Sequence, residues 1–340
     1  MPAIISHWLF GKKTAPLVAE RTDVAGFREK CFLWGCQGPD VLFFQRLAPW
    51  RRGQVVREYG SKLHDGSPSE LFAALADVLD TCSHQDCDPI LSYALGMCCH
   101  YSFDRIAHPY VNWLTDIMIA SDPRGPEFHY HGEIESMLDI MLLRHEKGLL
   151  PTEISLSDDC LPADDEVART LSYVWTKLLY SIYGIIFDPK CADALCADMR
   201  ECFSLLEDRH ALRRPIFGGI ERAIRKNDAP VTAFMRPMTE SLRRDYGNVG
   251  KKEWFNPLVP DERSSESWYE ICDRAVGDAA EMMDFFMKTI RPATDADGKY
   301  IPENRSLRIR RDFSEFTEER SFSNNCDETG AREKVRQMTK

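Results

Sequence analysis

Two sets of His, Asp and Glu residues, each spaced by four, lie close together in this chain. The members are His100, Asp104 and His108 in the first set and His131, Glu135 and Asp139 in the second. Residues four apart in an α-helix project from nearly the same face. Each set would therefore direct imidazole nitrogens and carboxylate oxygens to one point, as zinc and similar cations require. The spacing predicts metal ligands carried on helices.

Helix signals dominate the rest of the sequence, whereas alternating strand patterns are scarce. Ser67-Pro68-Ser69-Glu70 has the pattern of a capping box with Pro at the first helical position, which predicts a helix start. Asp88-Pro89 repeats the signal, and this helix is expected to carry the first set until Pro109 forces the chain out near His108. Further helices are expected from apolar spacing over residues 130–147, 164–185, 190–209, 216–227 and 265–290. The predicted fold class is all-α, a multi-helix bundle.

We expect one all-α metal-binding domain over residues 1–290, in which residues 245–263 form a loop before the last long helix. Charged residues, Ser, Asn and Gly then become frequent, so residues 291–340 are expected to form a charged, irregular and flexible C-terminal tail. Four arginines between residues 305 and 311 form a basic cluster that could touch phosphate or a membrane. Acidic neighbours offset this charge, which favours a solvated arm.

Composition narrows the class of protein further. A net charge of −11 and a pI near 5.4 argue against general binding to nucleic acid or anionic lipid, which depends on Lys and Arg contacts. No apolar run is long enough for a transmembrane helix, and no basic segment precedes the short apolar start, so we expect a cytoplasmic protein without a signal peptide. The 12 cysteines are expected to be reduced and mostly buried, because several lie in amphipathic runs where free Cys behaves as a small apolar residue. Pairs of cysteines five residues apart do not match the spacing of zinc knuckles.

Three further candidate ligands precede the first set: His7, Asp40 and His64. Asp40 follows a Gly-Pro turn signal, and His64 comes just before the capped helix. Multi-metal pockets in all-α proteins are assembled from ligands that project inward from several helices. Simpler interpretations exist for two of them. His7 could belong to the apolar start of a core helix, and Asp40 could be only a helix N-cap.

The sequence resembles the zinc-dependent phospholipases C and, more distantly, the single-strand nucleases that share their all-α trinuclear zinc fold. The matching elements are Ser6-His7-Trp8-Leu9, Gly38-Pro39-Asp40, His64, the segment from Leu95 to Asp104, His108-Pro109, and His131-x-x-x-Glu135-x-x-x-Asp139. The resemblance covers about residues 5–140. It implies hydrolysis of a phosphoester at two or three Zn²⁺ ions. The substrate would be a phospholipid, a nucleotide or another small phosphodiester.

The resemblance also implies a division of the ligands among the ions. The implied sets are His64, His100 and Asp104 for one zinc, His108, His131 and Glu135 for a second, and His7 with a bridging Asp104 for a third. Asp40 would be a general base beside the metal or an additional ligand. Secreted family members complete the third site with their mature N-terminus, so that site is expected to be incomplete or rebuilt here. The gap between Asp104 and His108 is shorter than in the best-known members, which predicts a displaced second metal.

Three alternatives remain at this point. His129 and Glu133 form a competing pair with the same spacing, but Ile134, Leu138 and Met141 place an apolar surface beside the face of His131, which we therefore prefer. The doublet His64-Asp65 is also found in HD-type phosphohydrolases, although that interpretation leaves the evenly spaced sets without roles. Finally, a helical protein that keeps a metal for structure alone would have closed coordination, whereas a catalytic site keeps an open position.

Overall fold

The computed structural model describes residues 3–21, 24, 26–48, 50–83, 86–123, 127–210, 212–225, 231–240, 244–291 and 305–326. Helices make up about two thirds of it, and the fold is all-α as the sequence predicts. The α-helices are α1 (Ile4–Arg21), α2 (Glu29–Cys36), α3 (Glu58–His64), α4 (Pro68–Thr81), α5 (Cys87–Ser121), α6 (Glu127–Lys147), α7 (Asp165–Tyr183), α8 (Pro189–Ala192), α9 (Leu195–Leu206), α10 (Arg213–Arg225), α11 (Trp268–Thr289) and α12 (Arg305–Thr317). Short 3₁₀ segments are η1 (Gly38–Phe44), η2 (Pro151–Glu153) and η3 (Thr232–Phe234).

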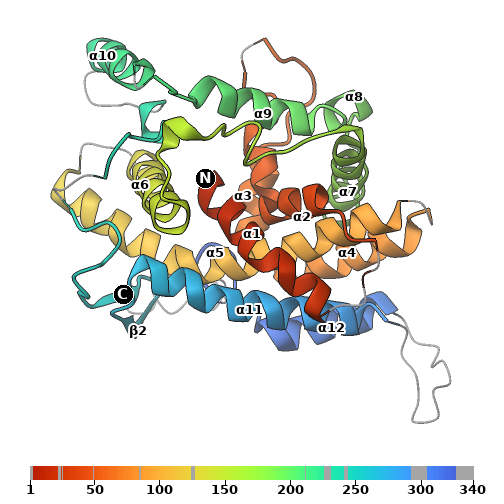
Figure 1. Ribbon diagram of the computed structural model, residues 1–340. Coiled ribbons are helices and arrows are strands. Elements are labelled where there is room, and N and C mark those ends of the chain that lie inside the picture. Colours follow the sequence, from red (N-terminus) through yellow and green to blue (C-terminus); the bar gives the residue numbers. More distant parts are fainter. Residues whose placement is uncertain are drawn as a thin grey trace, which may run out of the picture.

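Helix α5 runs through the middle of the fold, with α1, α2, α6, α7 and α11 packed around it (Figure 1). Two glycines let α2 and α5 approach backbone to backbone. A Cβ on Gly35 would lie 2.1 Å from the Tyr93 carbonyl oxygen, and one on Gly96 would lie 2.1 Å from the Phe32 carbonyl oxygen. This close contact brings η1, which follows α2 directly, onto the middle of α5.

The expected end of this helix at Pro109 is wrong, because α5 continues to Ser121. Proline removes one backbone hydrogen bond from a helix interior, at a cost of about 3 kcal/mol. Here Tyr110, Val111 and Leu114 are buried beyond the proline, and the Tyr110 hydroxyl donates to the Tyr246 carbonyl at 2.6 Å. Tertiary packing on both sides of Pro109 therefore offsets the local cost. The same helix carries all three candidate ligands of the first set.

The expectation of an irregular C-terminal tail is corrected for residues 305–326. Helix α12 packs along α4, and Ile309, Phe313 and the following Phe322 are fully buried in the main core. The basic cluster also has partners within the protein, since Arg305 pairs with Asp80 and Arg310 with Glu70. Apolar residues four apart bury one face of α12, which the charged composition obscured. Residues 292–304 and 327–340 lie outside the described part.

Other segments differ from expectation in smaller ways. The stretch expected as a loop holds an antiparallel hairpin of β1 (Trp254–Asn256) and β2 (Val259–Ser264), too short for its alternation to be recognised. The helix expected over 190–209 is divided into α8 and α9. Within the described ranges, no helix combines the length and apolarity needed to cross a bilayer.

One cysteine pair also departs from the expectation of reduced thiols. Cys82, directly after α4, and Cys87, the first residue of α5, form a disulfide with Cα atoms 5.8 Å apart. This distance is typical of disulfides. The ten other cysteines are free and buried, as expected.

Candidate metal centre

All eight candidate site residues predicted from the sequence converge around the middle of α5. His100, Asp104 and His108 project from one side of this helix. The others arrive from four further elements: His7 from α1, Asp40 from η1, His64 from the last residue of α3, and His131 and Glu135 from α6. His108 and His131 are partly buried and the other six are buried. Ligand-type atoms from distant parts of the chain therefore share one interior region.

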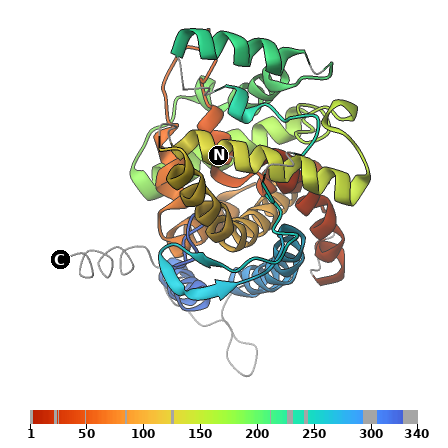
Figure 2. The same cartoon turned by 90° about the vertical axis from the view of Figure 1, so that its left-hand side faces the viewer.

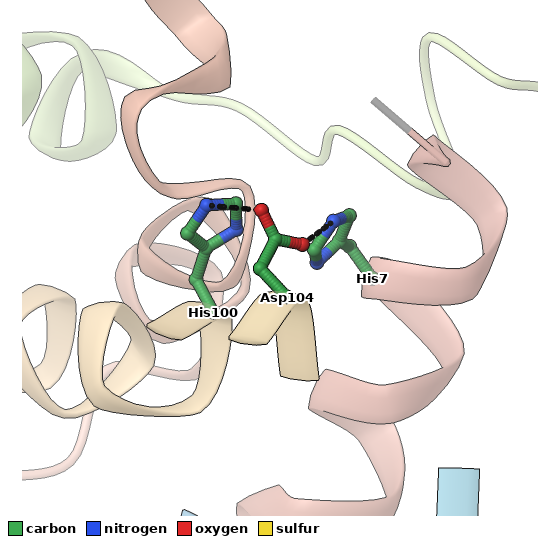
Figure 3. Close-up of side chains that lie close together, drawn as sticks. All are labelled: His7, His100 and Asp104. Carbon is green, nitrogen blue, oxygen red and sulfur yellow. Dashed lines mark ion pairs between the residues drawn. The ribbon is translucent and has the colours of Figure 1, made fainter. Parts of the chain in front are cut away.

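Asp104 is the centre of this arrangement and has histidines on both sides (Figure 3). Its Oδ1 lies 3.1 Å from His7 Nε2, and its Oδ2 lies 3.3 Å from His100 Nε2. The same Oδ2 is 3.4 Å from His64 Nε2 and 3.6 Å from His108 Nδ1. The two oxygens of one carboxylate thus face different histidines, which is the geometry that a bridging ligand needs.

Asp40 and His64 complete a group on the His100 side of Asp104. Asp40 Oδ1 lies 3.2 Å from His64 Nε2, and its Oδ2 lies 3.9 Å from His7 Nε2. Asp40, His64 and His100 each offer one ligand atom, and these three atoms lie within 4.8 Å of one another. The same holds for His7, His100 and Asp104. Each set is compact enough to surround a single ion.

A second region lies between α5 and α6 and contains His108, His131 and Glu135. Their ligand atoms also fall within 4.8 Å of one another. Glu135 Oε1 is 3.2 Å from His131 Nε2 and 3.8 Å from His108 Nε2, and the two imidazole rings stack with centroids 5.6 Å apart. This trio is the set that the family resemblance implies for a second zinc.

Backbone carbonyls orient three of the imidazoles. His64 Nδ1 is 2.7 Å from the Gly60 carbonyl oxygen, and His100 Nδ1 is 3.1 Å from that of Cys36. His108 Nδ1 is 3.2 Å from the carbonyl oxygens of both Asp104 and Phe322. A carbonyl can only accept, so each Nδ1 must donate its hydrogen there. Each Nε2 is then available as a ligand, and such contacts fix the ring orientation at metal sites.

Gly38 supports this arrangement because it lies directly against a ligand. Its φ angle is +53°, and a Cβ at this position would lie 2.2 Å from the Cδ2 atom of His100. Only glycine adopts this backbone conformation readily and leaves the necessary space. The Gly-Pro-Asp segment thereby places Asp40 while keeping the His100 ring free to turn toward Asp104.

The pKa values of the residues at this centre are shifted by burial and by the close packing of histidines and carboxylates. Burial lowers the pKa of His100 to about 4, outweighing the opposing effect of Asp104. Burial also disfavours the charged form of His64, but hydrogen bonds to Asp104 and Asp40 raise the pKa of His64 to about 10. Although burial acts against ionisation of Asp104, the surrounding histidines hold its pKa well below the usual range. Without a metal, a proton on His64 supplies positive charge between two carboxylates.

The donor set fits a bound cation on a second, independent ground. His100 Nε2 is fully buried and has no hydrogen-bond partner within the described structure, although Asp104 Oδ2 lies 3.3 Å from it. Unsatisfied buried polar atoms are costly, and a cation between a lone pair and a carboxylate would satisfy both. A small cavity of about 10 Å³, roughly the space that one water molecule needs, adjoins His7, Asp104, His108 and Glu135. Imidazole and carboxylate donors are those that zinc binds.

Asp139 does not join the metal centre, which corrects the expectation that the whole second set faces one point. Its side chain accepts hydrogen bonds from the backbone N–H groups of Ser6 at 2.8 Å and Ile5 at 3.3 Å, at the start of α1. It also pairs with Arg236, whose nitrogens lie 3.0 Å and 2.6 Å away. Asp139 therefore anchors the first turn of α1, the helix that presents His7.

The competing pair on α6 lies away from the centre. His129 Nε2 is 3.9 Å from Glu133 Oε2, and Glu133 accepts a hydrogen bond from the Tyr246 hydroxyl at 2.8 Å. The apolar flank of His131, formed by Ile134, Leu138 and Met141, is buried as expected. The helix is thus turned with His131 toward His108.

An open cavity of about 750 Å³ reaches the centre from outside, and His64, His108 and His131 lie in its wall. Asp40 is not among the residues that line it. Segment 318–326 forms part of this wall through Ser323 and Asn324, and the buried Phe322 ring packs on His64 and His100. This contribution could not be predicted from the sequence, because any residue type can supply a backbone carbonyl acceptor such as that of Phe322.

Comparison with known proteins agrees with this geometry. No curated protein and no solved structure matches the chain. The sequence model of the family described as "Zinc dependent phospholipase C" matches residues 6–183, which include all eight residues of the centre and amount to more than half of the 340-residue chain. The chain therefore belongs to the zinc-dependent phospholipase C family.

Proposed function

We propose that this protein is a zinc-dependent hydrolase of phosphoesters and that its substrate is a phospholipid. The observation that carries the proposal is the position of the clustered donors. Three compact groups of donors lie close together around Asp104, and three of their histidines, His64, His108 and His131, border an open cavity. A purely structural zinc site would be closed, whereas a catalytic one keeps a position for substrate or water.

In this proposal the ligands divide as the family resemblance implies, with one refinement. Asp40, His64, His100 and Asp104 would hold the first ion, and His108, His131 and Glu135 would hold the second. His7 would contribute to a third, together with Asp104. Asp40 is buried and turned toward His64, which favours the role of additional ligand over that of a general base facing substrate. Residues 1 and 2, which precede the third set, lie outside the described part.

Zinc bound there supplies Lewis acidity toward a phosphoryl oxygen and lowers the pKa of water toward about 7. The protein residues hold the geometry in which this chemistry occurs. The carbonyls of Gly60, Cys36 and Phe322 keep Nδ1 of their histidines protonated and Nε2 free. Asp104 lies between His7, His64, His100 and His108, and would hold this part of the centre together when the ions are bound.

The lining of the cavity bears on the class of substrate. Asp65, Asp116 and Glu127 contribute carboxylates to it, Phe43 and Phe128 contribute aromatic rings, and none of its lining residues is Lys or Arg. Such a wall disfavours a polyanion such as nucleic acid, since phosphate backbones are held by cationic side chains. We therefore propose a phosphodiester with a neutral or cationic alcohol, as in a zwitterionic phospholipid.

The HD-type alternative receives no support from the geometry. Asp65 is exposed, accepts a hydrogen bond from the Ser323 hydroxyl at 3.0 Å, and does not join any of the donor groups. A doublet of His and Asp ligands would need both side chains at the metal.

The experiment that tests the proposal compares hydrolysis of three substrates by the zinc-loaded protein. These are dispersed phosphatidylcholine, phosphatidylinositol and a chromogenic phosphodiester. We expect release of phosphocholine, inhibition by a chelator, and recovery on adding zinc. The His131→Ala variant should be inactive, whereas His129→Ala should retain activity. A fully zinc-loaded protein that hydrolyses none of the three would contradict the proposal and favour a structural metal site.

A further inference from the structure

Helix α10 lies at the upper edge of the molecule in both views (Figures 1 and 2), and it contacts η3 and the residues beside it. The side of α10 that makes these contacts is polar. Arg214 Nε donates to the Met235 carbonyl at 3.0 Å. Glu221 accepts from the Val231 N–H at 3.0 Å and from the Thr232 hydroxyl at 2.7 Å. Arg214 and Glu221 are half-buried by these contacts.

The opposite side of α10 is apolar and open to solvent. Leu212, Ile216 and Ile220 are four residues apart and therefore lie on the same face of the helix, with Phe217 beside them. These four side chains are between 41% and 61% exposed. A surface helix of a globular protein normally buries its apolar stripe and exposes its polar face. Helix α10 instead exposes its apolar face and turns its polar side toward the protein. The apolar face is therefore available to bind a membrane or another molecule.

Charge indicates what covers this face. Residues 207–226 include six Lys or Arg (Arg209, Arg213, Arg214, Arg222, Arg225 and Lys226) and three acidic residues (Glu207, Asp208 and Glu221), an excess of three positive charges. The whole chain has a net charge of −11, so positive charge is concentrated in this segment. A second copy of the chain docked through α10 would place two such basic segments together, and like charges oppose association. An anionic surface has the complementary charge.

We propose that α10 is an interfacial helix that lies in the surface of an anionic lipid bilayer. Amphipathic helices with basic polar faces and Leu, Ile or Phe on the other side bind in this way, parallel to the membrane plane. The apolar stripe would enter the boundary between head groups and acyl chains, and nearby Lys and Arg would contact lipid phosphates. The helix lies outside the matched family region, and the proposal does not depend on catalysis.

The test measures binding of the full chain to vesicles by co-sedimentation. Vesicles of phosphatidylcholine alone are compared with vesicles that also contain phosphatidylglycerol. The test variants are Ile216→Asp and Phe217→Asp. Ile186→Asp is the matched control, because Ile186 is an apolar residue, 82% exposed, in the loop after α7. All three positions are exposed, so the variants should fold, which circular dichroism and thermal unfolding would verify.

We expect the wild type to bind the anionic vesicles and to be released by added salt, because exposed charges are screened. Each substitution on α10 should weaken the partition coefficient by roughly tenfold or more, since it removes a large apolar side chain from the interface. Ile186→Asp should bind like the wild type. Hydrolysis of a soluble phosphodiester by the α10 variants should not change, which separates this proposal from the proposed function.

A conservative variant gives a direct readout of insertion. Phe217→Trp should show extra tryptophan fluorescence, beyond that of the wild type, that brominated acyl chains quench. Three results would overturn the proposal. These are no binding of the wild type to anionic vesicles, binding by Ile216→Asp and Phe217→Asp equal to that of the wild type, or no quenching of the extra fluorescence of Phe217→Trp. Self-association in sedimentation velocity that both Asp variants abolish would assign the apolar face to a second copy instead.

Discussion

The histidines at positions 129 and 131 offer a matched test of the metal centre. Both are on α6, and both side chains are 17% exposed. They differ in what they face: His131 Nε2 is 3.2 Å from Glu135 Oε1, whereas His129 Nε2 is 3.9 Å from Glu133 Oε2. His131→Ala and His129→Ala should therefore cost similar packing energy. Only His131→Ala removes a member of the group that contains His108.

The expected magnitude follows from the number of protein ligands in that group. Structural zinc sites with four ligands gain roughly 10–16 kcal/mol on binding, which is roughly 3 kcal/mol per ligand. Losing one of three protein ligands should thus weaken binding of this ion by roughly a hundredfold. After dialysis against a zinc buffer, elemental analysis should find about one zinc fewer per chain in His131→Ala than in the wild type. His129→Ala should keep the full content.

Activity provides a second readout for the same pair. Hydrolysis of a chromogenic phosphodiester should fall to background in His131→Ala and remain near wild type in His129→Ala. The reverse pattern, with zinc lost from His129→Ala, would move the second ion to Glu133 and require α6 to be turned by about 200°. Equal zinc content in all three proteins would refute the assignment of His131 as a ligand.

Three further predictions concern other parts of the centre. Asp104→Asn should remove more zinc than Asp40→Asn, because of these two aspartates only Asp104 has histidine nitrogens 3.1–3.6 Å from both of its carboxylate oxygens. Equal zinc loss from the two variants in elemental analysis would contradict a bridging role for Asp104. Phe322→Ala should lower the free energy of unfolding of the zinc-free protein by about 3–5 kcal/mol, because the buried Phe322 ring packs on His64 and His100. Urea unfolding measures this loss, and a loss below about 1 kcal/mol would contradict the packing. Zinc binding near neutral pH should release protons, because the raised pKa of His64, about 10, keeps it protonated in the zinc-free protein. Affinity should therefore rise with pH, and calorimetry in buffers of different ionisation enthalpy that finds no proton release would oppose this.

Local periodicity explains why most of the centre could be predicted from the sequence. His100, Asp104 and His108 depend only on the turn of one helix, and so does the pairing of His131 with Glu135. Asp139 has the same spacing but faces the start of α1 and Arg236. Its role depends on how α1 docks against α6, which spacing along one helix cannot reveal.

The remaining differences also arise from tertiary contacts. Pro109 signals a helix end locally, yet packing on both sides of it keeps α5 continuous. In α12, Ile309 and Phe313 are four apart and buried, but the abundance of charge around them favoured an irregular arm. The partners of that charge, Asp80 and Glu70, lie far away in the sequence. Ligand geometry was thus predictable, whereas the carbonyls and side chains that support it were not.

The most direct test of the central claim is a crystal structure of the zinc-loaded protein with anomalous data collected on both sides of the zinc absorption edge. This measurement counts the ions and identifies their ligands together. We predict at least two zinc peaks, one among Asp40, His64, His100 and Asp104 and one among His108, His131 and Glu135. A zinc-supplemented protein with no peak at either group, or with zinc bound only elsewhere, would contradict the account.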